Sequence, residues 1–253
     1  MGVRRPPQTS PRRKVLSALV ALAFSGATLA NPTGQAVVAG SASFATAGKT
    51  LTVTNSPNAI LNWQGFSIGV GETTRFQQQS VQSAVMNRVV GQDPSAILGT
   101  LSSNGRVFLL NPNGIVFGAG SRVDVAGLVA STLNLSNQDF LAGRLNFEAG
   151  AVANPIVNHG NVATPSGGRV YLIAPNVENH GVISTPQGQT ILAAGKTVQL
   201  VEADVPNLRV ELQAGGEALN VGQILADGGS AGIYAGLINQ RGIVRADSVS
   251  RDA

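Results

Sequence analysis

The segment Asn158-His-Gly-Asn-Val-Ala-Thr-Pro165 recurs 21 residues later as Asn179-His-Gly-Val-Ile-Ser-Thr-Pro186. A fixed period of this length indicates a chain that makes the same turn repeatedly, with each turn stacked on the one before. Further copies extend the register: the segment that starts at Gly105 returns at Gly168, and the one that starts at Gly222 returns 20 residues later at Gly242. The first of these offsets is 63 residues, or three periods of 21, so we expect those two segments to lie three coils apart.

The repeat unit has the chemistry of strands and turns. Short runs alternate apolar residues, as in Val170, Leu172 and Ala174, and Gly, Asn and Pro separate the runs. A leucine-rich repeat has a similar period, but it needs leucines at a fixed stagger and a helical return, whereas Gly and small residues fill the return here. The chain contains 31 Gly and 12 Pro with only 12% charged residues, which suits a narrow stacked core with frequent turns.

These features predict an all-β fold, a single-stranded parallel β-helix of the pectin-lyase-like type with coils about 4.8 Å apart. Roughly ten coils are expected, from a spacing of about 20 residues. We expect Asn158 and Asn179 at turn corners, where Asn tolerates left-handed backbone, and their stacked side chains form a possible ladder. The stretch 201–215 breaks the pattern and is interpreted as a hairpin that stands off the helix.

The first thirty residues have the pattern of a secretory signal peptide. Five basic residues precede an apolar run from Val15 to Leu29, and small residues end it at Ala30. Cleavage is expected near Ala30, with Asn31 as the first mature residue. The pair Arg12-Arg13 also permits a twin-arginine signal, but its continuation is weak and the general secretory route is favoured. The run is too short for a typical membrane-spanning helix.

Removal of this leader changes the charge of the chain. All five leader charges are positive, so 17 minus 5 leaves 12 basic residues against 13 acidic ones, a net charge of minus 1. A nucleic-acid binder needs a basic face that survives processing, and none is visible. The chain has no cysteine, which excludes thiolate metal sites and a cysteine nucleophile.

Several motifs occur together, in order, between the leader and the repeats. They resemble the amino-terminal secretion domain of filamentous haemagglutinin, the high-molecular-weight adhesins and the haemolysins of two-partner secretion. The resemblance continues into the Asn-His-Gly coils and covers nearly the whole mature chain. The motifs are Asn62–Gly69, Thr74–Gln77, Met86–Val89, Asp93–Leu101 and Gly105–Gly118.

The resemblance implies a right-handed β-helix with an N-terminal β cap, at about residues 31–100, and coils over about 101–253. It implies a secreted or cell-surface protein that passes through the periplasm. Its partner there would be a cognate outer-membrane β-barrel transporter with periplasmic receptor domains. The domain is then expected to nucleate β-helix folding of an adhesin or haemolysin-type protein. A host surface glycan or receptor would be contacted through regions further along, because we expect the chain to be a fragment of a longer exoprotein.

The family motif maps onto Asn111, Pro112, Asn113, Gly114 and Ile115. Weaker recognition candidates, namely Asn87, Arg88 and Val89, stand where filamentous haemagglutinin has a second Asn-Pro-Asn motif. Pro112 fixes φ and the pair Asn113-Gly114 accepts positive φ, so the segment is also predicted to be a tight turn between two strands. Two roles remain open: a structural turn whose loss misfolds the domain, and direct contact with the transporter.

Other candidate residues favour structural roles. His159 and His180 should stack one coil apart, but two ligands without a carboxylate pair make a poor metal site. Asp227 and Asp247 should also stack, as the carboxylates of a glycosidase would, but they lack a surrounding cluster. Trp63, Phe66 and Phe76 form either an exposed recognition face or, more commonly, a buried end of the core. We therefore expect no catalytic residue, cofactor or metal.

Two other functions stay open on sequence grounds. One is a short, self-sufficient carbohydrate-binding adhesin. The other, less favoured, is a pectin-lyase-like polysaccharide-degrading enzyme, because a fold alone never establishes an activity.

Overall fold

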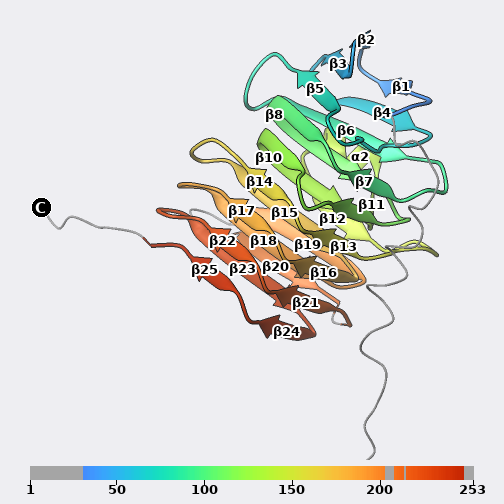
Figure 1. The fold of residues 1–253 in the computed structure, drawn as a ribbon. Helices are drawn as coiled ribbons and strands as arrows, with labels where there is room; N and C mark the ends of the chain where they lie inside the picture. Colours follow the sequence, from blue (N-terminus) through green and yellow to red (C-terminus); the bar gives the residue numbers. More distant parts are fainter. Residues whose placement is uncertain (1–30, 203–207, 214, 248–253) are drawn as a thin grey trace, which may run out of the picture.

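The computed structural model describes residues 31–202, 208–213 and 215–247, and the leader expected at residues 1–30 lies outside this part of the chain. The described chain winds through stacked coils that form three faces (Figure 1). Strands on one face pair in parallel with the strands of the coils before and after. The expected all-β fold class, a right-handed parallel β-helix with an N-terminal β cap, is confirmed. Within the described residues, no helix has the length and apolar character needed to cross a membrane.

Two of the faces belong to one large sheet, because β8 (Thr100–Leu110) and β10 (Arg122–Ser131) are long enough to bend across both. The first face contains the first halves of these strands together with β3 (Thr50–Asn55), β5 (Thr73–Gln77), β14 (Asn161–Ala163), β17 (Val182–Ser184), β22 (Gln223–Leu225) and β25 (Ile243–Arg245). The second face contains their second halves together with β4 (Ala59–Trp63), β6 (Ala84–Val89), β15 (Arg169–Ala174), β18 (Gln189–Ala194) and β23 (Ser230–Ala235).

The third face is a separate sheet of six short strands. In order, these are β7 (Ser95–Ile97), β9 (Ile115–Phe117), β13 (Ile156–Asn158), β16 (Asn176–Asn179), β21 (Glu217–Asn220) and β24 (Leu237–Gln240).

The N-terminal end of the helix is closed by antiparallel strands. Here β1 (Ala36–Ala39) pairs with β4, and β2 (Ala42–Ala47) pairs with β3. Parallel pairing already starts where β3 meets β5 and β4 meets β6, within the segment that the sequence assigns to the cap. The antiparallel strands thus cover the first coil and leave no open edge of β4 at this end.

Alternation along the second-face strands builds two cores. Val85, Val107, Leu128 and Val170 point into the helix and belong to an inner core that is almost completely buried. The residues that follow them, Met86, Phe108, Val129 and Tyr171, point outward and are also buried, in an outer core. Full burial of a side chain of this size contributes about 1.5–3 kcal/mol, so an outward apolar row requires a cover.

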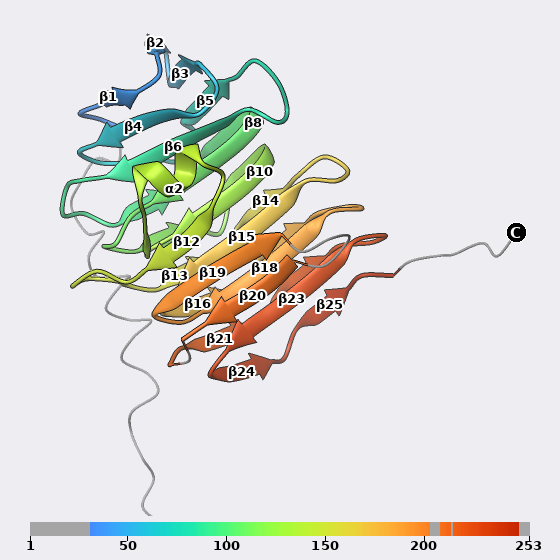
Figure 2. The same cartoon turned by 180° about the vertical axis from the view of Figure 1, so that it is seen from behind.

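The cover is a four-stranded sheet made from two excursions out of the coils (Figure 2). The first excursion carries β11 (Asn134–Leu135), α2 (Asn137–Leu141) and β12 (Leu145–Glu148), and the second is the hairpin of β19 (Thr197–Glu202) and β20 (Leu208–Leu212). The outer core contains residues of both excursions, among them Phe140, Phe147 and Val198. The sequence correctly predicts a hairpin in the 201–215 region, but the prediction that it stands off the helix is wrong, because the hairpin lies on the second face.

The excursions also correct the expected coil spacing. Arg106 pairs with Gly127 on the next coil, and Gly127 pairs with Arg169 on the one after. The repeats that start at Gly105 and Gly168 are therefore two coils apart, and the prediction of three is wrong. The first excursion accounts for the extra residues.

Polar side chains at the ends of four third-face strands form a ladder, in which the three asparagines are buried and the final glutamine is exposed. Asn158 Nδ2 donates to Asn179 Oδ1 at 2.8 Å, and Asn179 Nδ2 donates to Asn220 Oδ1 at 2.8 Å. Asn220 Nδ2 then donates to Gln240 Oε1 at 2.9 Å. The expected ladder is confirmed. The expected left-handed backbone is not found, since the described non-glycine residues with positive φ are Asn58 and Gln187.

Candidate recognition site

The segment from Asn111 to Ile115 is a tight turn between β8 and β9. Gly114 N donates to Asn111 O at 3.1 Å and closes the turn, and Gly114 has a φ of 113°, which favours glycine. Gly114 and Ile115 are buried, whereas Pro112 and Asn113 are half-buried. The sequence prediction of a turn between two strands is confirmed.

The side chain of Asn111 is buried completely and satisfies its hydrogen bonds inside the protein. Its Nδ2 donates to Asp93 O and to Ser95 Oγ, both at 3.0 Å. Its Oδ1 accepts from the backbone N of Asn113 at 3.0 Å. Asn111 therefore ties its own turn to the loop that precedes β7 on the previous coil.

Asn113 extends these ties in both directions along the axis. Its Nδ2 donates to Gly91 O at 2.9 Å, and its carbonyl accepts from Asn154 Nδ2 at 3.1 Å. Asn154 N also donates to Pro112 O at 2.9 Å. The turn is thus held between the loop after β6 and the end of the first excursion, and every polar group named here has an internal partner.

The weaker candidates lie on β6, directly beside the strand that leads into this turn. Asn87 pairs with Leu109 and Arg88 with Leu110, so the two motifs are neighbours on adjacent coils. Asn87 is fully buried: its Oδ1 accepts from Trp63 Nε1 at 2.9 Å and its Nδ2 donates to Phe108 O at 3.2 Å. Val89 is buried in the inner core.

Arg88 points the other way, into the outer layer. Its Nη1 donates to Asn137 Oδ1 and its Nη2 to Leu135 O, both at 2.8 Å. Burial lowers the pKa of Arg88, because desolvation disfavours the charged guanidinium. Arg88 therefore joins β6 to β11 and to the start of α2, and neutral oxygen atoms accept its hydrogen bonds.

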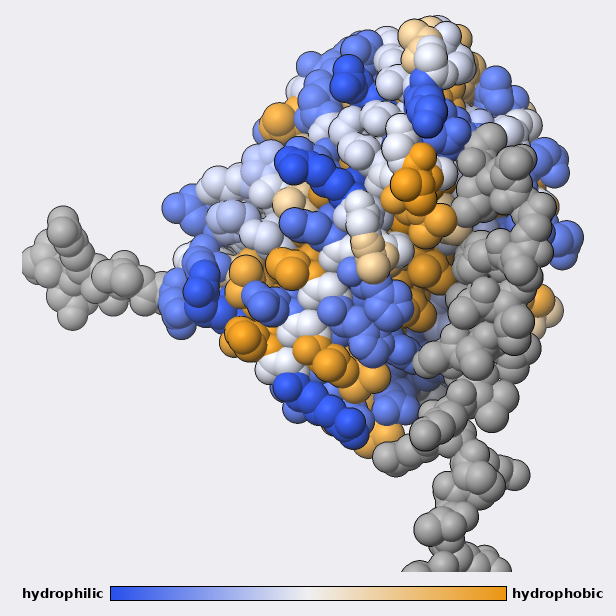
Figure 3. All heavy atoms as spheres, in the orientation of Figure 1, coloured by the Kyte–Doolittle hydropathy of each residue, from blue (hydrophilic) through white to orange (hydrophobic). Residues whose placement is uncertain are grey.

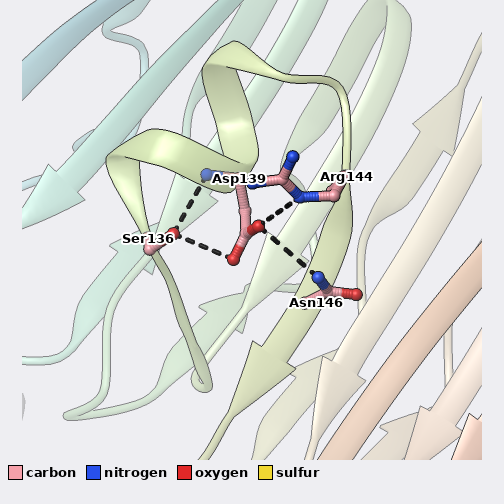
Figure 4. Close-up of polar contacts among 4 residues, drawn as sticks. All are labelled: Ser136, Asp139, Arg144 and Asn146. Atoms are coloured by element: carbon pink, nitrogen blue, oxygen red, sulfur yellow. Dashed lines mark hydrogen bonds and ion pairs between the residues drawn. The ribbon is translucent and has the colours of Figure 1, made fainter.

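A polar cluster holds the short helix that Arg88 contacts (Figure 4). Ser136 is the N-cap of α2 and its hydroxyl accepts from Asp139 N at 3.0 Å. Asp139 Oδ1 accepts from Arg144 Nε at 2.7 Å and from Asn146 Nδ2 at 3.5 Å. Hydrogen bonds from Arg144 and Ser136 lower the pKa of Asp139.

This helix lies outside the repeat and was not predicted, although the spacing of Ser136 and Asp139 is a capping signal that precedes the apolar pair Phe140-Leu141.

The remaining candidate residues lie at exposed turns, in an ion pair or in the core. The imidazoles of His159 and His180 stack with centroids 4.8 Å apart, and His180 Nε2 lies 2.9 Å from Glu178 Oε2. No group of three or more potential metal-ligating His or acidic side chains occurs in the described part of the chain. Asp227 Oδ1 accepts from Arg245 Nε at 2.7 Å, so this carboxylate is part of an ion pair. Trp63, Phe66 and Phe76 are buried, as expected, and pack against one another.

Comparison with known proteins agrees with this architecture. The family model of the TPS secretion domain matches residues 28–253. The crystal structure of the HMW1 secretion domain from Haemophilus influenzae superposes with a TM-score of 0.83 at 38% identity, over 87% of this chain and 60% of that one.

Two heme/hemopexin-binding proteins of Haemophilus influenzae are also similar. They are 30% and 35% identical to this chain, over 62% and 48% of its length. The matched regions span 21% and 14% of these relatives, so the chain corresponds to a small part of each. The family model covers nearly the whole chain, and the chain belongs to the TPS secretion domain family.

Proposed function

We propose that this chain is the export domain of a two-partner secretion exoprotein. A cognate outer-membrane β-barrel transporter, through periplasmic receptor domains, recognises the domain and passes it to the cell surface or the medium. The observation that carries this proposal is the match of fold and sequence to the HMW1 secretion domain across 87% of the chain. The function is thus one of recognition and passage.

The route to the transporter begins with residues 1–30 as a cleaved signal peptide. The first residue after the proposed cleavage, Asn31, is already part of the cap: its Nδ2 donates to Lys49 O at 3.1 Å and its Oδ1 accepts from Thr74 Oγ1 at 3.0 Å. Pro32 is buried beside it. A domain that begins at residue 31 would therefore keep these contacts of the cap.

The last described coil supports a second role, in which the domain templates folding of further coils. Leu237 is 51% exposed and Ile243 is 53% exposed. Apolar side chains are visible in this lower part of the molecule in Figure 3. Any chain that continues the helix would pair with β23, β24 and β25 and cover these residues.

For the motif Asn111–Ile115, we propose a mainly structural role in export. Its side-chain amides bond to the preceding coil, and two of its carbonyls accept from Asn154 on the other side. Only Pro112 and Asn113 retain partial exposure. The same role is proposed for Asn87 and Arg88, whose side chains are used inside the fold. Direct contact with the transporter would then fall to exposed surface elsewhere.

Export in a reconstituted system tests the proposed function. The chain is expressed in a Gram-negative host with and without the transporter encoded beside it, and the culture medium is assayed for the processed protein. We expect secretion that needs the transporter, with the protein retained in the periplasm when it is missing. Equal secretion in both strains would contradict the proposal.

Two variants of the motif separate the structural role from contact. Asn113→Ile removes the bond to Gly91, and Asn111→Ala removes the buried ties to Asp93 and Ser95. We expect both variants to have a lower melting temperature than the wild type. The variant with the lower melting temperature should also be exported in the smaller amount. Lost export of Asn113→Ile with an unchanged circular dichroism spectrum and melting temperature would instead assign the motif to transporter contact.

A further inference from the structure

The bond proposed for leader cleavage lies directly against the folded cap. Asn31, the residue that follows it, is tied through its side chain: Nδ2 donates to Lys49 O at 3.1 Å, and Oδ1 accepts from Thr74 Oγ1 at 3.0 Å. Lys49 precedes β3 and Thr74 lies on β5, so one amide group joins two neighbouring strands of the first face. Many domains begin with a few poorly ordered residues. This one has no such spacer after the proposed bond.

The next three residues are also held by the cap. Pro32 is buried, and its ring fixes φ. Thr33 N donates to Gly65 O at 2.9 Å, and Thr33 O accepts from Gln64 N at 3.0 Å. Gly34 has a φ of 66°, and an added Cβ would collide with the side chain of Gln64. The backbone after the proposed bond therefore follows one path along the first coil.

These contacts oppose the action of a peptidase. A peptidase needs accessible backbone on both sides of the bond that it cuts, which is why exposed, loosely held segments are the usual sites of proteolysis. Residues that bond to the cap have to leave it before they can enter an active site. Cleavage of the folded chain then depends on the small population in which this segment is open.

We infer that the leader is removed before the cap closes, because the closed cap protects the bond between Ala30 and Asn31. Hydrolysis consumes one water molecule and leaves the carboxyl group of Ala30 and the amino group of Asn31. The inference rests on the proposed function, in which residues 1–30 are a signal peptide, and it adds the order of two steps. A chain that closes its cap first keeps the leader, and the apolar leader would hold it at the inner membrane.

Cleavage by purified signal peptidase tests this order. The substrate is the 253-residue chain with its leader, refolded in one sample and kept unfolded by urea in the other, as checked by circular dichroism. A synthetic peptide of residues 20–40 carries the same bond without the cap, and it measures the effect of urea on the peptidase itself. After this correction, we expect the folded chain to be cut at least about tenfold more slowly than the unfolded chain, because opening breaks several hydrogen bonds.

The two possible failures are distinguishable. Equal corrected rates for the folded and unfolded chain would overturn the inference and leave the signal peptide standing. No cleavage after Ala30 in the unfolded chain or in the peptide would overturn the signal peptide, and the inferred order with it.

Variants that loosen the segment should speed cleavage of the folded chain. Thr74→Val removes the hydroxyl that donates to Asn31, at a site that is 0% exposed, and should raise the rate about fivefold. Its matched control is Thr73→Val, because alternation along β5 places Thr73 on the opposite side of the strand. Equal rates for these two variants would contradict protection by the cap.

A second pair of variants acts on the backbone. Gly34→Ala should speed cleavage of the folded chain more strongly, since positive φ and the collision with Gln64 both favour release of the segment. Gly143→Ala is its matched control: Gly143 has a φ of 71°, but an added Cβ would meet no atom within 4 Å, and the residue lies after α2, away from the cap. A rate for Gly34→Ala no higher than that for Gly143→Ala would also contradict the inference.

Discussion

At the scale of single residues, buried amides hold the coils together. Asn87, Asn111 and Asn158 are each 0% exposed, and each joins its coil to another part of the chain. The sequence indicates the positions of Asn111 and Asn158, because motif and repeat mark them. It does not reveal that Asn87 bonds to Trp63, since the two residues are 24 apart and meet only through the pairing of β4 with β6.

The Asn87 contact makes a prediction about stability. Asn87→Ala leaves Trp63 Nε1 buried without an acceptor, which should cost about 1–3 kcal/mol of the free energy of unfolding. Urea unfolding followed by tryptophan fluorescence measures this, because Trp63 is the single tryptophan of the chain. Asn161→Ala is the control, since that amide is exposed and should change stability little. An unchanged unfolding midpoint for Asn87→Ala would contradict the assignment.

The stacked imidazoles predict a dependence of stability on pH. Burial, and then the neighbouring His180, lower the pKa of His159, while Glu178 acts in the opposite sense. A histidine whose pKa is lowered by folding binds fewer protons in the folded state. Stability should therefore decrease as the pH falls below the unfolded pKa of about 6.5, and the decrease should level off below the folded pKa.

Melting temperatures of wild type and His159→Gln between pH 7.5 and pH 5 test this effect. We expect the variant to lose less stability on acidification than the wild type does. Parallel curves for the two proteins would show that His159 does not contribute.

At the scale of elements, the coil register depends on glycine. A Cβ on Gly181 would lie 2.1 Å from the carbonyl oxygen of Gly160, and one on Gly222 would lie 2.0 Å from that of Gly181. Atoms cannot approach so closely, so only glycine allows this turn to stack on itself. The repeated glycines are visible in the sequence as part of the 20- and 21-residue period, which is why the stacking of Gly160 on Gly181 and of Gly222 on Gly242 was predictable.

We therefore expect Gly181→Ala to destabilise the domain strongly, because either the turn or the neighbouring coil must shift. Gly120→Ala is a matched control on an earlier coil, next to Ser121, since its added Cβ would meet no atom within 4 Å and its φ is not positive. Thermal unfolding by circular dichroism compares the two. A melting temperature for Gly181→Ala equal to that of Gly120→Ala would contradict the close packing of this column.

The outer layer was the least predictable element. Its helix and strands lie outside the repeat, and β12 meets β19 across about fifty residues of sequence. One signal was present: second-face strands such as Val107–Leu110 are apolar on both faces, which is typical of strands covered on both sides. The period alone therefore predicts the coils but neither the excursions nor the surface that they bury.

At the scale of the whole molecule, the excursions determine how many coils the chain makes. Roughly ten coils were expected from the period, but β4, β6, β8, β10, β15, β18 and β23 are the second-face strands of the described chain. The missing coils correspond to residues used by the cap, by the first excursion and by the hairpin. The helix is thus shorter than predicted, and it is closed at one end by antiparallel strands and along one face by the outer sheet.

This asymmetry predicts a gradient of local stability along the axis. In the described chain, β13 and β16 are paired on both edges, whereas β24 pairs with β21 alone and β25 with β22 alone. A helix of stacked coils is stabilised mainly by contacts between neighbours, so a coil with one neighbour should open more easily.

Hydrogen exchange of the 253-residue chain, followed by mass spectrometry, should show amides of β24 and β25 exchanging well before those of β13 and β16. The cap strand β3, which pairs with β2 and β5, is the internal comparison and should exchange slowly. Uniform protection from β13 to β25 would mean that the coils unfold as one unit, and would contradict a helix stabilised by contacts between neighbouring coils.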